Sequence, residues 1–108
     1  MVDEAIKQAV RRFLIAVRQN GIQAESAVVF GSRAHGTARA DSDIDVVVIA
    51  PEFDQKPSRR LIERMWELRA ITDRRIEPVA CGRAEWAALV TGRAIIEIAR
   101  REGIEIAA

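Results

Sequence analysis

The stretch VVFGSRAHGTARADSDIDVVVIA, residues 28–50, decides the fold of this chain. It joins two apolar segments, 27–30 and 45–50, by a polar loop that begins at Gly31-Ser32. Both segments are short enough to be β-strands, and the second is continuously apolar, which is typical of a strand buried on both faces. The stretch therefore predicts two strands of a sheet with a polar, acidic connection between them.

Three aspartates, Asp41, Asp43 and Asp45, lie before or at the start of the second segment. Side chains at i and i+2 of a strand share a face, so we expect Asp43 and Asp45 to point together and Ile44 into the core. No Lys or Arg occurs within residues 42–50 to offset their repulsion. A cation between two such carboxylates relieves the repulsion, and Mg2+ prefers oxygen ligands. We therefore interpret Asp43 and Asp45 as a metal-binding pair and Asp41 as a turn residue.

The Gly31-Ser32 pair at the end of the first segment is the second part of the pattern. Glycine permits a sharp turn and the close approach of a ligand, and the N–H groups that follow can bind an anion. Arg33 adds a cation there. Phosphate donors beside metal-binding carboxylates are what phosphoryl or nucleotidyl transfer requires. Two metal ions usually need a third carboxylate, and Glu77, inside the otherwise apolar segment 76–81, is the best candidate.

Each of these residues also has a simpler interpretation when taken alone. Gly31-Ser32 is compatible with an ordinary turn, and Glu77 with an exposed strand residue. His35 is expected at the surface, with contact to a substrate as the alternative. Cys81 is expected to be a small buried hydrophobic residue, and both tryptophans, Trp66 and Trp86, belong either to the core or to a patch that faces a partner.

The remaining elements are predicted from periodicity and from start and stop signals. Ser58 is a suitable N-cap for a long helix, and Pro78 cannot donate to a ladder, so the third strand lies at an edge or carries a bulge. Helices are expected at 3–20, 58–73, 84–90 and 93–101, and strands at 27–30, 45–50, 76–81 and 104–107. This order predicts an α/β (α+β) fold, with a small mixed β-sheet flanked by helices.

Length and composition limit the classes of protein. The 108 residues predict a single domain, 1–108, with one modest core. A net charge of +1 gives no whole-molecule argument for binding nucleic acid or an anionic membrane. The chain shows neither a membrane-spanning run nor a signal pattern at its N-terminus, and its one cysteine cannot form an internal disulfide, so a cytoplasmic location is expected.

The segment 56–75 is locally basic, with seven Lys and Arg residues against three acidic ones. One interpretation is a solvated helix face with ion pairs between residues four apart. The other is a basic wall that faces an anionic ligand or partner. The sequence leaves both open.

Gly31-Ser32-Arg33 followed by Ser42-Asp43-Ile44-Asp45 resembles the signature of the DNA polymerase β-like nucleotidyltransferase superfamily. In that signature a Gly-Ser pair precedes Asp-x-Asp on the next strand, and a later strand supplies a third acid. GSRAHGTARADSDIDVVV is similar to the form found in minimal nucleotidyltransferases (MNT). These are small domains of about this length, typically encoded beside a HEPN-domain partner as a toxin–antitoxin pair. The resemblance covers nearly the whole chain.

The resemblance implies the nucleotidyltransferase fold, ATP as a substrate and two Mg2+ ions. The third acid would activate the attacking hydroxyl, directly or through a metal ion. Many members carry Asp at that position, whereas this chain has Glu followed by Pro. The implied catalytic and metal-binding acids are Asp43, Asp45 and Glu77, and the implied triphosphate-binding residues are Gly31 and Ser32, with Arg33 assisting.

The resemblance further implies transfer of AMP to a hydroxyl of a partner protein, here a tyrosine of a HEPN toxin, by a chain that acts as the antitoxin. An acceptor presented by a protein fits a short chain better than a free polynucleotide, so neither direct nucleic-acid binding nor a membrane is expected. Two alternatives remain open. One is a transferase of the same fold that acts on a small molecule, and the other is an antitoxin that neutralises its partner by binding alone.

Overall fold

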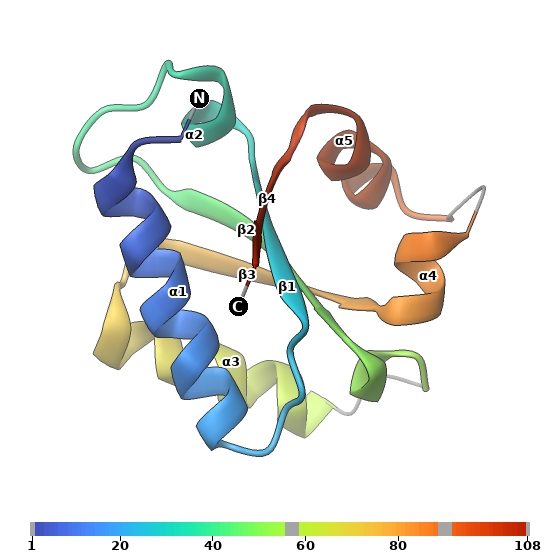
Figure 1. Ribbon diagram of the computed structural model, residues 1–108. Helices are drawn as coiled ribbons and strands as arrows, with labels where there is room; N and C mark the ends of the chain where they lie inside the picture. Colours follow the sequence, from blue (N-terminus) through green and yellow to red (C-terminus); the bar gives the residue numbers. More distant parts are fainter. Residues whose placement is uncertain (1, 56–58, 89–91, 108) are drawn as a thin grey trace.

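The computed structural model describes residues 2–55, 59–88 and 92–107, and its trace is shown in Figure 1. Helices and strands alternate along it in the expected order, so the predicted α/β class with a small mixed sheet is confirmed. The elements are α1 Glu4–Gln19, β1 Ser26–Phe30, α2 Ser32–His35, β2 Ile44–Ala50, η1 Pro51–Phe53, α3 Arg59–Thr72, β3 Ile76–Gly82, α4 Arg83–Ala87, α5 Ala94–Glu102 and β4 Ile104–Ala107.

The strands form one mixed sheet in the order β3-β2-β1-β4. β1 is antiparallel to both β2 and β4, whereas β2 and β3 are parallel and are connected through α3. Parallel neighbours need such a crossover, because the chain must return to the same end of the sheet. β3 lies at the edge, as Pro78 predicted.

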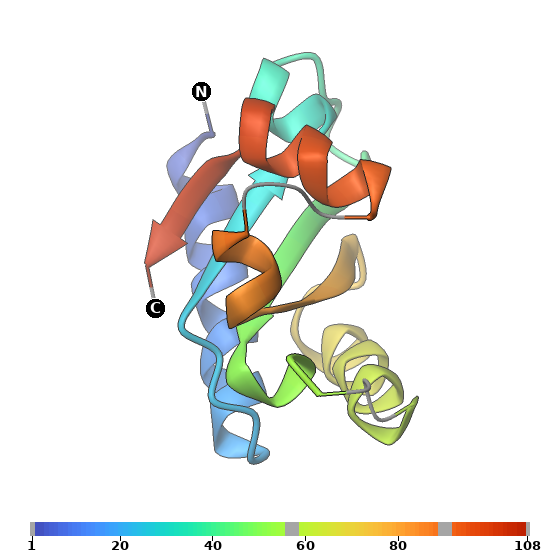
Figure 2. The same cartoon turned by 90° about the vertical axis from the view of Figure 1, so that its right-hand side faces the viewer.

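Helices cover both faces of the sheet (Figures 1 and 2). α1 and α3 pack on one face in a larger core cluster that includes Val46 and Val48 of β2. The other face forms a smaller cluster in which Val47 and Ile49 meet residues of α4 and α5. β2 is therefore buried on both faces, which confirms the interpretation of its continuous apolar run.

Local signals account for most helix boundaries. The Asp3 side chain accepts a hydrogen bond from the Ile6 N–H at 3.0 Å and caps α1, which ends just before Gly21 with its positive φ of 88°. The expected N-cap of α3, Ser58, lies outside the described residues. α4 ends at Ala87, before the predicted end of that helix at residue 90, and residues 89–91 also lie outside the described part of the chain.

One element was not expected, the short helix α2 directly after β1. Its four residues lie between Gly31 and Gly36, both with positive φ. Four residues are too few to show helical periodicity, and the flanking glycines indicate only a turn. None of the helices in the described part of the chain has the length and apolar character needed to cross a membrane.

Candidate active site

Asp45 and Glu77 lie side by side on neighbouring strands. The parallel register of β2 and β3 pairs these two residues, and it pairs Val47 with Val79 two positions later. Side chains two positions apart share a face, so both carboxylates lie on the face that α4 and α5 cover further along. Both residues are half-buried. The structure thus brings Glu77 to the position at which the sequence predicted a third acid.

Asp43 completes the acidic group from just outside the sheet, since it is exposed and immediately precedes β2. Burial and the charge of Asp43 raise the pKa of Asp45. Hydrogen bonding with Asp43, burial and the charges of Asp43 and Asp45 raise the pKa of Glu77, against an opposing effect of Arg69. Each carboxylate therefore disfavours the ionisation of the next, as expected for acids that share a site.

Gly31 brings the backbone against this acidic group. β1 pairs Phe30 with Asp45, so the next residue lies beside the Asp45 carboxylate. Gly31 has φ 71° and ψ −148°, and a Cβ on it would lie 2.5 Å from Asp45 Oδ2. Its carbonyl accepts the N–H groups of Ala34 and His35 at 3.0 and 3.2 Å, which starts α2 with Ser32 as the first residue. A glycine is needed here for conformation and for space.

Arg33 lies beside the loop that leads into β2. Its side chain is buried, and its Nη2 donates hydrogen bonds to the carbonyls of Ser42 at 2.8 Å and Ala40 at 3.2 Å. The guanidinium therefore binds the loop that leads into β2. The turn containing Asp41 is closed by Ser42, whose Oγ accepts the Arg39 N–H at 2.8 Å, while Asp41 itself is exposed.

The other singled-out residues follow their simpler interpretations. His35 is exposed and pairs with Glu102 at 3.1 Å. Cys81 is buried, and burial raises the pKa of its thiol to about 12. Trp86 packs against the smaller core cluster, and Trp66 is exposed with the Arg69 guanidinium 4.7 Å from its ring centroid.

The basic segment around α3 forms ion pairs in solvent. Arg59 pairs with Glu63 at 3.0 Å and Arg64 with Glu67 at 3.8 Å, and all four side chains are well exposed. This favours the interpretation of a solvated helix face. Arg75, just after α3, is different: its Nη1 donates to the Ala40 carbonyl at 2.9 Å. Sequence reasoning did not single it out, because in the sequence it is one more basic residue in a basic run.

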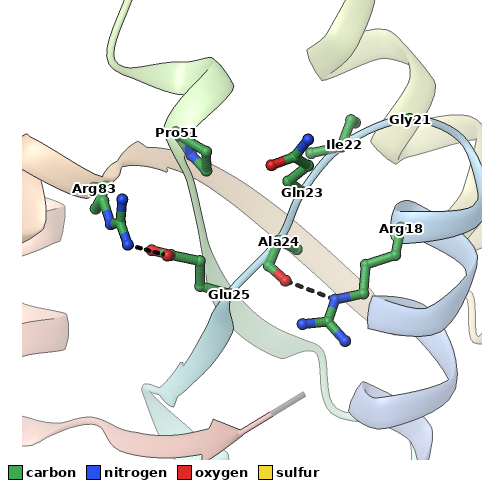
Figure 3. Close-up of a pocket in the computed structure, with 8 residues that line it drawn as sticks. All are labelled: Arg18, Gly21, Ile22, Gln23, Ala24, Glu25, Pro51 and Arg83. Carbon is green, nitrogen blue, oxygen red and sulfur yellow. Dashed lines mark hydrogen bonds and ion pairs between the residues drawn. The ribbon is translucent and has the colours of Figure 1, made fainter.

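A cavity of about 620 Å³ lies at the opposite end of β1 and β2 from the acidic group (Figure 3). At its walls Arg83 pairs with Glu25 at 2.8 Å, and Arg18 Nε donates to the Ala24 carbonyl at 2.8 Å. Pro51, which follows β2, also lines it. The acids at the start of β2 are therefore separate from this cavity.

The donor set at the acidic group suits a hard cation. Asp43, Asp45 and Glu77 offer only carboxylate oxygens, which Mg2+ prefers, and their mutual repulsion would be relieved by a cation. The absence of a side chain on Gly31 lets the Asp45 carboxylate lie directly against the backbone of the turn. Within residues 2–55, 59–88 and 92–107, no three acidic, His or Cys side chains already surround one common point.

Comparisons with known proteins agree with this geometry. A family model described as "Nucleotidyltransferase domain" matches residues 10–101, while no curated protein gave a significant match. A candidate nucleotidyltransferase from Sulfolobus solfataricus has a TM-score of 0.62 and 14% identity, over 92% of this chain and 77% of that chain. A toxin–antitoxin complex solved with AMP-PNP has a TM-score of 0.62 and 19% identity, over 93% of this chain and 71% of that chain.

At these identities the two structures show that the fold is shared. The family model adds the assignment by sequence, because the matched residues 10–101 are most of the chain. Members of this family generally use a nucleoside triphosphate and a divalent metal ion. The protein therefore belongs to the nucleotidyltransferase domain family.

Proposed function

We propose that this chain transfers AMP from ATP, with Mg2+, to a hydroxyl of a partner protein, and that it is the antitoxin of a HEPN toxin whose tyrosine receives the AMP. The observation that carries the transferase site is the pairing of Asp45 with Glu77 beside Gly31. The similarity in fold to a toxin–antitoxin complex solved with AMP-PNP supports the choice of a protein partner.

In the proposed reaction the hydroxyl oxygen of the acceptor attacks the α-phosphorus of ATP. The bond from that phosphorus to the oxygen of the β-phosphate breaks, and pyrophosphate leaves. The Gly31 backbone and the Ser32 hydroxyl hold the triphosphate. Glu77 would activate the hydroxyl by accepting its proton.

Asp43, Asp45 and Glu77 would together hold the Mg2+ ions. Bound there, Mg2+ supplies positive charge to the phosphate oxygens and lowers the pKa of the attacking hydroxyl. Asp45 on β2 and Glu77 on β3 would then be ionised, because a bound cation opposes the rise in pKa that the repulsion between the carboxylates causes.

The order of the strands suggests on which side of the site the leaving group and the acceptor would lie. Gly31 follows β1, Asp45 is on β2 and Glu77 is on β3, so the phosphate-binding turn, the metal-binding acid and the third acid follow one another across the sheet. An in-line displacement requires the leaving group and the attacking oxygen on opposite sides of the phosphorus. Pyrophosphate would therefore leave on the β1 side, and the acceptor would approach from the β3 edge.

Incubation with ATP labelled at the α-phosphate, Mg2+ and the protein encoded by the neighbouring gene tests the proposal. We expect label on that partner from the wild type, and a loss of at least about 100-fold in the Asp43→Asn/Asp45→Asn double variant. Asp41→Asn is the matched control, because this aspartate is exposed in the same loop and has no proposed role in catalysis. It should retain transfer.

Other outcomes distinguish the alternatives. Transfer of label to a small hydroxyl compound such as an aminoglycoside, with none on protein, would identify a small-molecule transferase. A tight complex with the partner and no label would indicate an antitoxin that acts by binding alone. Full transfer by the double variant would contradict the proposed site itself.

A further inference from the structure

We propose that Arg33 is a positioning residue that fixes Asp43 through the carbonyl of Ser42, and that it is not a ligand of the triphosphate. This inference rests on the proposed function for its consequence in catalysis. Its structural part stands on hydrogen bonds in the loop 36–43, which connects α2 to β2.

The hydrogen bonds of Arg33 are directed at the backbone of this loop. Both leave from Nη2, the far end of the side chain, and reach Ser42 O at 2.8 Å and Ala40 O at 3.2 Å. The side chain is 8% exposed, and its Nε is buried without a hydrogen-bond partner among the described residues. A guanidinium so placed is already committed to two carbonyls and is shielded from solvent, which leaves it poorly suited to meet a phosphate.

Arg75 holds the same loop from its other side. Its Nη1 donates to Ala40 O at 2.9 Å, so both arginines share this acceptor. Arg75 is itself fixed, because its Nε and Nη2 donate to the two carboxylate oxygens of Asp73 at 3.0 and 2.7 Å. The loop is therefore clamped by two cations, one buried and one at the surface.

Hydrogen bonds fix the backbone immediately before and after Asp43, and the clamp supplies the one before it. Arg33 holds the carbonyl of Ser42, and the N–H of Ile44 donates to the Arg75 carbonyl at 2.8 Å. Asp43 lies between these two anchored positions, immediately before the strand, so the inter-strand bond of Ile44 holds it on one side and Arg33 holds it on the other. The position of its carboxylate beside Asp45 and Glu77 thus depends on the clamp. Misplacing a reacting group by about 1 Å can cost about 100-fold in rate.

Arg33→Lys is the decisive variant. It keeps the positive charge, but the ammonium is a shorter point charge that cannot take the place of the distant Nη2. A positioning role predicts a fall in kcat of about 10- to 100-fold, with KM for ATP changed by less than about 3-fold. Arg39→Lys is the matched control, since Arg39 is an exposed arginine in the same loop whose side chain makes no recorded hydrogen bond in the described chain.

Two measurements that need no catalysis complete the test. Amides 37–43 should exchange hydrogen at least about 10-fold faster in Arg33→Lys than in the wild type or Arg39→Lys, because a hydrogen bond to a charged group is lost. ATP binding without metal should be unchanged in Arg33→Lys but weakened in Ser32→Ala.

The opposite results would overturn the inference. Unchanged amide exchange, together with weaker metal-free ATP binding in Arg33→Gln than in Arg33→Lys, would identify Arg33 as a phosphate ligand. Should Arg33→Lys fail to fold by circular dichroism, Arg75→Lys loosens the Ala40 carbonyl that both arginines hold and replaces it in the amide-exchange and kcat measurements, while Arg33→Gln serves for ATP binding. If the wild type transfers nucleotide to no acceptor, the proposed function fails, while amide exchange and metal-free ATP binding still decide the role of Arg33.

Discussion

Gly31 has a backbone conformation, φ 71° and ψ −148°, that residues with side chains rarely adopt, and Asp45 Oδ2 lies where its Cβ would be. Two separate requirements, conformation and space, therefore meet at one residue. Asp45 in turn carries a charge that burial and Asp43 disfavour. At the scale of single residues, a glycine that leaves space for a carboxylate lies beside a group of acids that disfavour one another's ionisation.

Gly31→Ala tests whether this position needs a glycine. We expect it to lower the free energy of unfolding by about 1–3 kcal/mol, because the conformation is strained for alanine, and to abolish transfer, because the methyl group displaces Asp45. Gly36→Ala is the matched control, with φ 76° but no atom within 4 Å of the added Cβ. Urea unfolding and the transfer assay on both variants check this, and equal activity in the two would contradict it.

Asp45→Asn tests whether the charge of Asp45 destabilises the metal-free chain. The raised pKa means that the folded chain binds this proton more tightly than the unfolded chain, so stability falls as pH rises from the ordinary value of 3.8 through the raised value. Removing the charge should therefore stabilise the metal-free chain at pH 7, by up to about 1 kcal/mol, because the burial and the repulsion by Asp43 that disfavour the charge no longer act. The gain should vanish below pH 3.8. Urea unfolding at both pH values measures it, and destabilisation at pH 7 would refute it.

At the scale of elements, β3 shows how an edge strand is protected beside the site. Arg69 Nε donates to the Ile76 carbonyl at 2.7 Å, and Arg93 Nη2 donates to the Ala80 carbonyl at 2.6 Å. Pro78, between them, has no N–H to offer. Side chains thus occupy the edge that another strand would otherwise pair with, so an acceptor can approach Glu77 without adding a strand to the sheet.

The turn from α3 to β3 depends on the pairing of Asp73 with Arg75. Hydrogen bonding to Arg75 lowers the pKa of Asp73, so the stability it gives is present above the ordinary pKa of 3.8 and is lost as pH falls through the lowered value. Asp73→Asn should cost about 1 kcal/mol at pH 7 and much less at about pH 2. Glu67→Gln, on the exposed face of α3, is the control and should change little. Thermal unfolding at the two pH values measures both.

At the scale of the whole molecule, the two faces of the sheet have unequal cores. The larger cluster joins α1 and α3 to the sheet, and it includes Phe13 among the largest fully buried side chains. The face with α4 and α5, which also carries the site, has the smaller cluster, in which α5 contributes Ile96 and Ala99. α5, on the face of the sheet that carries the acids, is thus held by the smaller cluster of buried apolar side chains.

Native-state hydrogen exchange should reflect this inequality. We expect the amides of α5 to exchange through an opening that costs less free energy than global unfolding, and those of β1 and β2 through global unfolding. Ile96→Ala should accelerate exchange mainly in α5. Phe13→Ala should instead lower the global free energy of unfolding by about 3–5 kcal/mol. Equal exchange free energies for α5 and β2 would show that the two faces open together.

The sequence by itself determined the parts that depend on neighbours along the chain. The apolar runs predicted β1 and β2, and the continuous run of β2 predicted its burial on both faces. The two ends of α1 depend on local signals, because Asp3 caps its start and Gly21 follows its end. Gly31-Ser32 and the aspartates marked the candidate site, because turn chemistry and the alternation of a strand are local properties. α2 was not predicted, since its four residues are too few to show the periodicity of a helix.

Only the tertiary structure decided which distant residues meet. Glu77 lies opposite Asp45 because of a parallel register set across the α3 crossover, and no local pattern specifies that register. Arg33 and Arg75, which are 42 residues apart in sequence, both donate to the carbonyl of Ala40. In the sequence each is one arginine among many, and its role is fixed by where its side chain ends, which depends on packing and not on periodicity.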